Sequence, residues 1–370
     1  RIHICLIAGL FSLSVYAQQK AVDYVNPMIG TDGYGNVYPG AQIPFGGIQI
    51  SPDTDAKFYD AAAVYKYNHT SILGFSLTQL RGTGIPDFGD FLFIPGTGEM
   101  KLDPGTRENP TEGYRSRYSH EKEWASPNYY AVELSDYGVK AEMTAGLRSG
   151  MFRFTYPKSD KAFIMIDMNH TLWQNCEWSN LRMENDSTLT GYKLVKGWGP
   201  ERHVYFTAVF SKKLKNLRIM QDKKLVIYNT SRFRSCYEAW GKNLMACISF
   251  AAEEGEEVIV KMSVSAVSTA GAMLNLQELN GMTFDALREK GVGLWEKELS
   301  KYQIEAKPEV KEAFYTAAYR AALHPFIFQE ADGQFRGLDK NIEKAEGFTN
   351  YTVFSLWDTY RALHPWFNLV

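Results

Sequence analysis

The amino-acid sequence predicts a large antiparallel β-sandwich followed by a helical region. From about residue 26 to residue 268, short apolar or alternating runs are separated by Gly, Pro, Asn and Asp, as in chains built from short strands. No helical run separates them, which argues against a parallel sheet with crossover helices. After Ser268 the apolar residues recur at helical spacing.

The composition is that of a globular protein with a balanced surface charge. The 370 residues are 45% hydrophobic and 22% charged, which is enough apolar material for one large or two ordinary domains. Forty basic and 42 acidic side chains give a net charge of −2, so no overall field favours nucleic acid or an anionic membrane. A neutral ligand fits this balance better.

The first 17 residues have the features of an export signal. Basic side chains precede an apolar stretch at residues 4–15, and Val15-Tyr16-Ala17 resembles a small-residue cleavage site. We therefore expect residues 1–17 to be a signal peptide and the mature protein to be exported, to the periplasm or the cell exterior. The apolar stretch is too short to span a bilayer, and no later segment predicts a transmembrane helix.

Three cysteines would remain in the mature chain, Cys176, Cys236 and Cys247. Their number and spacing match neither a disulfide framework nor a zinc site, although one bridge could form. We expect all three to be ordinary buried thiols.

The apolar periodicity predicts individual strands and helices along the chain. Strands of the sandwich are expected, for example, at residues 151–156, 162–167, 204–210 and 258–264. Two linker helices are expected at residues 270–279 and 284–302, with Thr283 or Asp285 near the cap of the second.

Pro308 is expected to open a third helix, which ends at residues 323–325. The segment at residues 319–326 returns at residues 360–366, and this separation fits a helical hairpin. The repeat indicates either the first helices of a helical toroid or a coincidence between two Ala-rich helices. The apolar face of the third helix is predicted to hold Val310, Ala313, Phe314, Ala317, Ala318 and Ala321.

Two Gly-rich segments are candidates for ligand contact. Residues 26–53 contain too many Gly and Pro for regular structure and predict a packed loop, either a pocket wall with the Phe45 ring facing a sugar or simply a set of β-turns. Residues 79–90 are no phosphate loop, because no Gly-Lys-Ser/Thr follows. Here Asp87 and Asp90 could bind hydroxyls or orient Arg81, or could only accept backbone hydrogen bonds.

Trp357 and Asp358 stand at the start of a helical pattern near the end of the sequence. A carboxylate beside an indole suits a pyranose site, because the sugar face stacks on the ring while hydroxyls donate to the carboxylate. The alternative makes Asp358 a helix N-cap and Trp357 a core residue. The seven His residues show no metal-ligand spacing, and no Gly-x-Ser-x-Gly elbow is present.

Together these segments resemble glycoside hydrolase family 92, the calcium-dependent exo-acting α-mannosidases. The similarity follows the order of the mature chain over nearly its whole length. The matching stretches are residues 25–31, 38–41, 44–46, 51–54, 74–76, 82–84, 86–90, 335–339 and 351–365.

The resemblance implies a β-sandwich domain at residues 18–269, linker helices at 270–307 and the start of an (α/α)6 catalytic toroid at 308–370. It also implies a toroid that continues beyond Val370, and an active site where sandwich and toroid meet. The expected reaction is removal of terminal α-1,2-linked mannose from N-glycans or mannans, by an inverting mechanism with a carboxylic acid and a carboxylate base and with calcium assistance. The acid, the base and the calcium ligands are expected beyond Val370, so no catalytic or metal-binding residue is assigned.

The resemblance also assigns the substrate-binding wall of the terminal-mannose subsite. This chain departs from the family pattern at two places. Gly35 and Asn36 stand where the family often has His residues. Where the family often reads Thr-His-x-Ser-Gly, this chain has Gln79 in place of the His and Arg81 in place of the Ser. The linkage and the leaving group are therefore open, and a non-catalytic sugar-binding protein or inactive fragment is the alternative. The predicted wall consists of Phe45, Gly46, Gly82, Thr83, Trp357 and Asp358.

Overall fold

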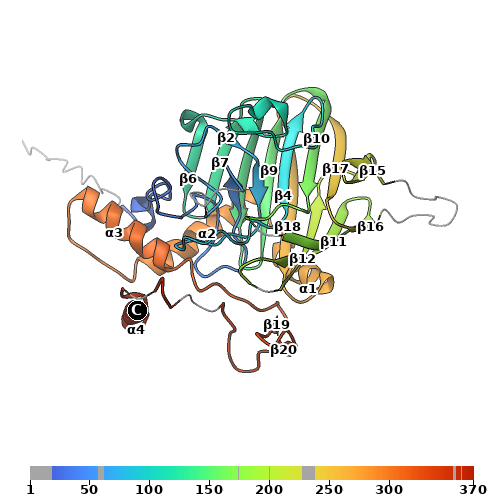
Figure 1. Ribbon diagram of the computed structural model, residues 1–370. Coiled ribbons are helices and arrows are strands. Elements are labelled where there is room, and N and C mark those ends of the chain that lie inside the picture. The colour runs from blue at the N-terminus through green and yellow to red at the C-terminus, as the bar shows by residue number, and fades with distance from the viewer. Residues whose placement is uncertain are drawn as a thin grey trace, which may run out of the picture.

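The computed structural model describes residues 19–56, 62–173, 175–199, 201–226, 238–352, 356–359 and 361–370. The predicted signal peptide and Cys236 lie outside the described residues. Two large sheets pack face to face, and helices follow them in the sequence (Figure 1). The predicted fold class, a sandwich followed by helices, is confirmed, whereas the domain boundaries at residues 269 and 307 stay predictions.

All described strand pairs are antiparallel, as the sequence predicts. The seven-stranded sheet has the order β1 (Ser51–Asp53), β3 (Gly74–Ser76), β4 (Leu92–Thr97), β10 (Ser159–Asp167), β17 (Leu244–Ala252), β14 (Leu217–Gln221) and β15 (Lys224–Leu225). The nine-stranded sheet has the order β16 (Glu238–Gly241), β11 (Asn175–Asn185), β12 (Thr188–Lys196), β13 (Arg202–Phe210), β18 (Glu256–Ser265), β9 (Ser149–Tyr156), β8 (Val139–Ala145), β7 (Tyr129–Leu134) and β6 (Glu123–Ser126). Two further sheets have two strands each: β2 (Ser71–Ile72) pairs with β5 (Ser116–Arg117), and β19 (Gln334–Arg336) pairs with β20 (Ile342–Lys344).

The core lies between the two sheets and is rich in phenylalanine. Phe152 and Phe154 are two residues apart on β9, so both project from the same, inward face of the sheet. Their ring centroids lie 5.1 Å apart, and Phe152 lies 5.2 Å from Phe93 of the opposite sheet. Cys176 and Cys247 are buried and free, as expected.

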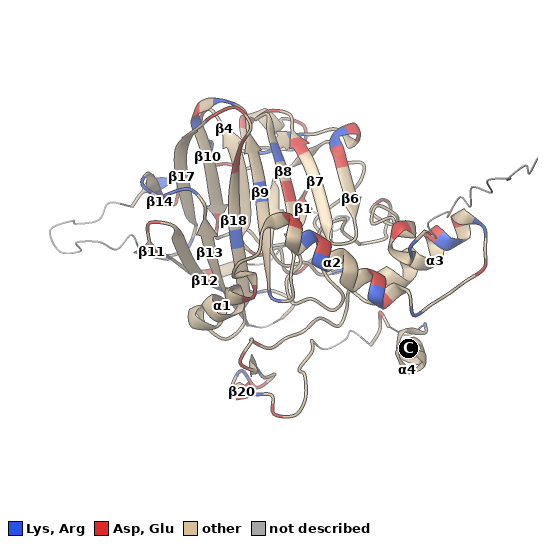
Figure 2. Ribbon diagram, turned by 180° about the vertical axis from the view of Figure 1, so that it is seen from behind, with Lys and Arg blue, Asp and Glu red and all other residues tan. Residues whose placement is uncertain are grey.

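The linker helices form where the sequence predicts them, and each begins at a side-chain cap. Ser268 accepts a hydrogen bond from the Gly271 amide at 3.0 Å at the start of α1 (Thr269–Leu276). Thr283 accepts one from the Ala286 amide at 3.2 Å at the start of α2 (Phe284–Leu299). From behind, both helices lie along the lower part of the nine-stranded sheet (Figure 2). Short 3-10 turns occupy Ala21–Tyr24 (η1), Pro110–Glu112, His120–Lys122 and Gln277–Leu279.

The third helix, α3 (Pro308–Ala321), begins at Pro308 as predicted, but its buried face matches the prediction only in part. Ala318 is buried and Phe314 is partly buried, as expected. Val310 is 53% exposed, and Ala313 and Ala317 are exposed as well. Beside Ala318, the buried stripe contains Tyr315 and Tyr319, which the prediction left out. These rings bury more apolar area than alanines do. Tyr315 stacks on Tyr24 of η1 at 5.6 Å, and Tyr319 packs at a tilt against Trp295 of α2 at 4.4 Å.

The sequence repeat does not repeat a structure. Its first copy ends α3, whereas the second copy begins α4 (Leu363–Leu369), whose N-cap is Ala362. A proline after a helix stops it, but a proline in the first turn is tolerated because the amide there has no helical partner. The described part of the chain contains no helix that is both long and apolar enough to cross a membrane.

Gly291 sets how closely α2 approaches the sheet, which gives a first prediction. A Cβ atom at Gly291 would lie 1.7 Å from Asn128 Nδ2, and hydrogen bonds to Thr144 and Ala145 hold that amide in place. We expect Gly291→Ala to lower the free energy of unfolding by about 1–3 kcal/mol through overpacking.

Gly293 of the same helix provides the control, because a Cβ there meets no atom within 4 Å. Gly293→Ala should raise the free energy of unfolding by about 0.5–1 kcal/mol through helix propensity. Urea unfolding of both variants measures the difference. Equal effects of the two substitutions would contradict the close docking of α2.

Candidate functional site

The Gly- and Pro-rich opening loop is held against the end of α3. The Phe45 amide donates to the Ala322 carbonyl at 2.8 Å, and the Ile327 amide donates to the Phe45 carbonyl at 2.9 Å. The Gln42 side chain donates to the Leu323 carbonyl at 2.9 Å. The prediction of a packed loop is confirmed, and Phe45 lies where the sandwich and the later helices meet. We call this region the junction.

Arg320, on the last turn of α3, fixes the opening loop from the other side. Its guanidinium donates to the carbonyls of Tyr38 at 2.9 Å and Ile29 at 3.3 Å, and also to that of Pro27. Trp295 donates its indole N–H to the Gln42 carbonyl at 2.7 Å. Sequence reasoning missed Arg320, whose only signal was its place in the Tyr-Arg-Ala repeat.

The second Gly-rich loop reaches the junction as well. The Gly82 amide donates to the Asn36 carbonyl of the opening loop at 2.7 Å, and the Arg81 guanidinium donates to the Arg320 carbonyl. Gly82 has a φ of +73°, in the left-handed region that favours glycine. The structure therefore places Phe45 and Gly82 at the junction, with Gly46 and Thr83 next to them in the chain.

The junction contains two arginines and one histidine that are not neutralised by an acidic side chain among the described residues. Arg81 and Arg320 form no ion pair with any described residue, and burial lowers the pKa of Arg81 to about 10. Burial and the neighbouring Arg81 lower the pKa of His324 to about 3, so its imidazole is neutral near pH 7. Neither ring nitrogen of His324 has a hydrogen-bond partner among the described residues. His324 therefore lies buried beside Arg81 at the end of α3, and no spacing in the sequence pointed to it.

Trp357 and Asp358 lie in a turn at residues 356–359 rather than at the start of a helix. Trp357 is 82% exposed and Asp358 is half-buried, so neither the core role nor the N-cap role that we considered applies. The Phe45 ring contacts Tyr351 at 6.4 Å and Phe367 at 6.0 Å, which flank this turn in the sequence. A substrate-binding role for Trp357 and Asp358 stays a prediction.

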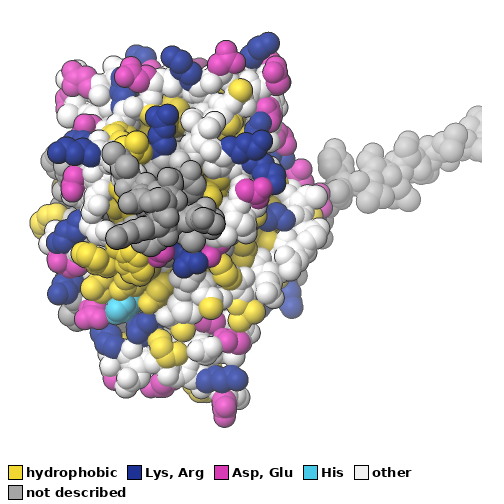
Figure 3. Space-filling view, turned by 90° about the vertical axis from the view of Figure 1, so that its right-hand side faces the viewer, with side chains coloured by type: hydrophobic (Ala, Val, Ile, Leu, Met, Phe, Trp, Pro, Cys, Tyr) yellow, Lys and Arg dark blue, Asp and Glu magenta, His cyan; other side chains and the backbone are white. Residues whose placement is uncertain are grey.

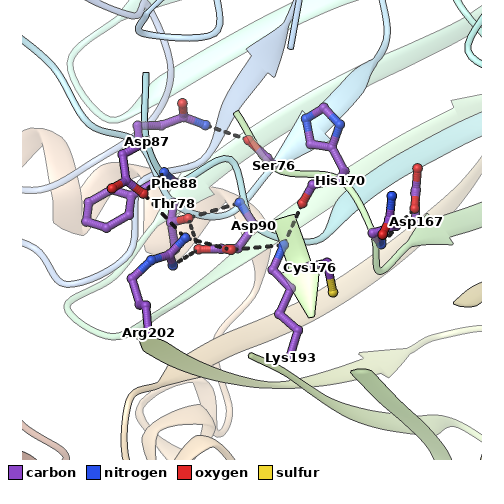
Figure 4. A network of polar contacts seen from close by, with 12 residues as sticks. Ser76, Thr78, Asp87, Phe88, Asp90, Asp167, His170, Cys176, Lys193 and Arg202 are labelled. Carbon is purple, nitrogen blue, oxygen red and sulfur yellow. Dashed lines mark hydrogen bonds and ion pairs between the residues drawn. The ribbon is translucent and has the colours of Figure 1, made fainter. Parts of the chain in front are cut away.

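A buried ionic network fixes the base of the second Gly-rich loop (Figure 4). The Asp90 carboxylate accepts a hydrogen bond from Thr78 at 2.6 Å and pairs with Lys193 at 2.9 Å and with Arg202 at 3.2 Å. Burial alone would raise the pKa of Asp90, but the Arg202 and Lys193 charges hold it well below its ordinary range. The idea that Asp90 orients Arg81, or accepts only backbone hydrogen bonds, is therefore wrong.

The same network continues across the sandwich. Lys193 Nζ donates to the His170 carbonyl at 2.5 Å, and His170 Nε2 lies 2.6 Å from Asp53 Oδ2. On the other side, the Arg202 guanidinium lies 4.7 Å from the Phe88 ring. Lys193 is fully buried and alternates with core residues along β12. A lysine at an inward position of a strand is therefore the sequence signal that could have indicated this network.

None of the six predicted site residues lines either of two cavities in the described structure, although the smaller cavity adjoins the junction through Gly47 and Ile327. The smaller, of about 90 Å³, includes Glu330, whose pKa is raised by burial. It is smaller than the roughly 300 Å³ of ordinary ligand sites. The larger, of about 1260 Å³, opens beside His170 and Trp173. Within the described ranges, no group of three or more His, Cys, Asp or Glu side chains could hold a metal ion.

The buried charges of the network generate a second prediction. Asp90→Asn would leave Lys193 and Arg202 without their counter-charge, and should lower the free energy of unfolding by about 3–5 kcal/mol. Because the pKa of Asp90 is depressed in the folded state, this contribution is complete above the ordinary carboxyl pKa of about 4 and is lost as the pH falls further.

Urea unfolding between pH 3 and pH 8 measures this effect, with Asp136→Asn as the control. Asp136 pairs with Arg117 at the surface, so its substitution should have a much smaller effect. A gap between the wild type and Asp90→Asn that stays constant below pH 4 would contradict the network.

Residues 24–265 match the model of the glycosyl hydrolase family 92 N-terminal domain, and residues 271–370 match that of the family 92 catalytic domain. Among curated proteins, an uncharacterized secreted glycosidase of Arthroderma benhamiae is 27% identical over 158 residues, which are 42% of this chain and 20% of that protein.

Solved structures of the same family resemble the chain over nearly its full length. The family GH92 alpha-mannosidase BT3965 from Bacteroides thetaiotaomicron, solved with mannoimidazole, is 80% identical with a TM-score of 0.93. The match covers 95% of this chain and 46% of that one. The GH92 glycosyl hydrolase ccman5 is 26% identical with a TM-score of 0.80, over 91% of this chain and 45% of its own. The chain thus spans about half the length of these solved relatives.

Proposed function

This chain belongs to glycosyl hydrolase family 92, and from that premise we propose that the protein is an exo-acting α-mannosidase. The observation that carries the proposal is the 80% identity with BT3965, an alpha-mannosidase that was solved with mannoimidazole. An identity this high over 95% of the chain leaves few differences with which to bind another class of sugar. The described junction is consistent with a sugar site, because it combines an aromatic ring with neutral and cationic hydrogen-bonding groups.

In the proposed site, the two Gly-rich loops form one wall of the terminal-mannose subsite. The Phe45 ring would face the apolar side of the sugar, and the exposed Gly82 would allow a close approach to the backbone. The half-buried Asp358 would accept hydrogen bonds from sugar hydroxyls. Arg81 is a fixed positive charge where the family often has Ser, so we expect it to influence which leaving group is accepted.

The finer features rest on the family resemblance. We propose an inverting mechanism, in which one carboxylic acid protonates the leaving oxygen and a carboxylate activates water on the opposite face. We assign neither group to a residue of this chain. We further propose that the bond cleaved is α-1,2, that the substrates are N-glycans or mannans, and that the protein acts in the periplasm or outside the cell.

Calcium is part of the proposal only at the level of the family. The ion would supply Lewis-acid assistance at the mannoside. The described residues offer no cluster of acidic or histidine side chains for it, so we give this chain's described residues no role in holding the ion.

Asp358 is the residue whose substitution tests the subsite. We expect Asp358→Asn in the intact enzyme to lower kcat/KM by about two to four orders of magnitude, because charge-assisted hydrogen bonds to hydroxyls contribute about 1.5–3 kcal/mol each. The loss should be similar for an activated aryl α-mannoside and for a mannose disaccharide. Selective rescue of the aryl substrate would instead identify Asp358 as the general acid, and normal activity on both would leave it outside the site.

Metal removal tests the calcium proposal. Dialysis of the intact enzyme against EDTA should abolish hydrolysis of an aryl α-mannoside, and added Ca²⁺ should restore it. Circular dichroism before and after dialysis controls for unfolding. Full activity of the metal-free, folded protein would contradict calcium assistance, and the absence of any turnover before dialysis would favour the non-catalytic sugar-binding alternative.

A further inference from the structure

Exposed tryptophans gather at one edge of the nine-stranded sheet. Trp240 on the edge strand β16 is 54% exposed, Trp178 on the neighbouring β11 is 46% exposed, and Trp198 in the turn between β12 and β13 is 67% exposed. Figure 3 views this side of the sandwich and shows hydrophobic side chains gathered on it. In Figure 1 this edge lies across the sandwich from α3. A cluster of large, solvent-exposed apolar side chains commonly marks a binding surface.

The strand register places these rings on one face of the sheet. Asn180 pairs with Trp240 on one side and with Tyr192 on the other, and Tyr192 pairs in turn with Tyr205. Paired residues project from the same face, so the four form one row across β16, β11, β12 and β13. Trp178, two residues from Asn180, projects from that face as well. We call Trp178, Trp240, Tyr192 and Tyr205 the aromatic strip.

The strip is preorganised by ring contacts. The Tyr192 and Tyr205 centroids lie 4.7 Å apart, and the His203 ring stacks on Tyr192 at 5.9 Å. The Tyr192 hydroxyl lies 3.0 Å from His203 Nδ1. Because neighbouring strands are about 4.8 Å apart, Trp240 and Tyr192 stand roughly 10 Å from each other along the row. This spacing gives successive stacking surfaces for an extended chain of rings.

Polar groups at the strip are paired with one another. The Trp240 indole N–H donates to Glu238 Oε1 at 3.0 Å, and the Asn180 amide donates to the same oxygen at 3.2 Å. Arg182 lies 3.9 Å from the other Glu238 oxygen, and Glu201 lies 2.7 Å from His203. The strip therefore has little net charge, yet it keeps carboxylate and amide oxygens that can accept hydrogen bonds beside its rings.

From this combination we propose that the aromatic strip is an accessory, non-catalytic binding surface for a neutral, mannose-containing glycan chain. Aromatic faces beside hydrogen-bonding groups match the alternation of apolar ring faces and hydroxyls in such a chain. A protein partner fits less well, because four partly exposed rings of about 150–250 Å² present at most roughly 400 Å². A stable interface buries about 800 Å² on each side.

This inference rests on the proposed function, since it assigns the same class of glycan to a second surface. The experiment compares the intact enzyme with its Trp178→Ala/Trp240→Ala variant by affinity electrophoresis in gels that contain α-mannan or, as a control polysaccharide, dextran. Each lost ring should weaken mannan binding by up to about tenfold. Trp124→Ala is the matched control, because Trp124 is also 46% exposed but lies on β6, the opposite edge strand of the same sheet.

The expected result is strong retardation by mannan but not dextran for the wild type and Trp124→Ala, and loss of retardation for the double variant. Trp178→Tyr/Trp240→Tyr, which keeps a ring at both positions, should retain most of the binding. All variants should hydrolyse a small aryl α-mannoside at the wild-type rate. Equal loss in Trp124→Ala, unchanged binding in the double variant, or a dimer that dissociates on substitution would overturn the inference.

The two proposals fail separately in this experiment. An enzyme that hydrolyses the aryl mannoside but migrates unretarded through mannan retains its proposed function and lacks the second surface. A protein that mannan retards through Trp178 and Trp240, but that hydrolyses no α-mannoside, has the binding surface without the proposed function.

Discussion

The arrangement of the junction depends on one constraint, that backbone polar groups removed from water need hydrogen-bond partners. The opening loop has too little regular structure to pair its own carbonyls, and a helix leaves the carbonyls of its last turn unpaired. In this structure the loop and the helices provide hydrogen-bond donors for each other's carbonyls. The Phe45 amide and Gln42 side chain donate to the carbonyls just beyond α3, while Arg320 and Trp295 donate to the carbonyls of the loop. This exchange fixes the loop on the helix end.

The second Gly-rich loop depends on the first in the same way. Its tip is joined to the opening loop through the Gly82 amide and to α3 through Arg81, while its base is tied to the nine-stranded sheet by Asp90 and Arg202. Because a buried carboxylate between two cations has little freedom, the loop is held at both ends. The opening loop, the second Gly-rich loop and the end of α3 are thus held together at the junction.

The two aromatic surfaces suggest different uses of the same chemistry. At the junction, a few rings stand near buried polar groups such as His324, whose ring nitrogens have no hydrogen-bond partner among the described residues, and we propose that this site recognises one terminal sugar. At the β16 edge, the rings are exposed and their polar neighbours are already paired, which suits weak contact with a longer chain. Burial strengthens each polar contact in the first case, and repetition of stacking provides binding in the second.

The sequence by itself determined the antiparallel sandwich, the start of each linker helix and the packed character of residues 26–53, because strand alternation, Ser and Thr caps and Gly-Pro content act locally. It also carried the family resemblance, and with it the choice of Phe45 and Gly82. Tertiary structure alone decided which face of α3 is buried, since two tyrosines found aromatic partners on η1 and α2. It likewise decided that similar segments end α3 and begin α4, and that Asp90 pairs with Lys193 and Arg202. Such pairings join residues more than a hundred positions apart, and no local propensity encodes a contact that exists only after the sheets have packed.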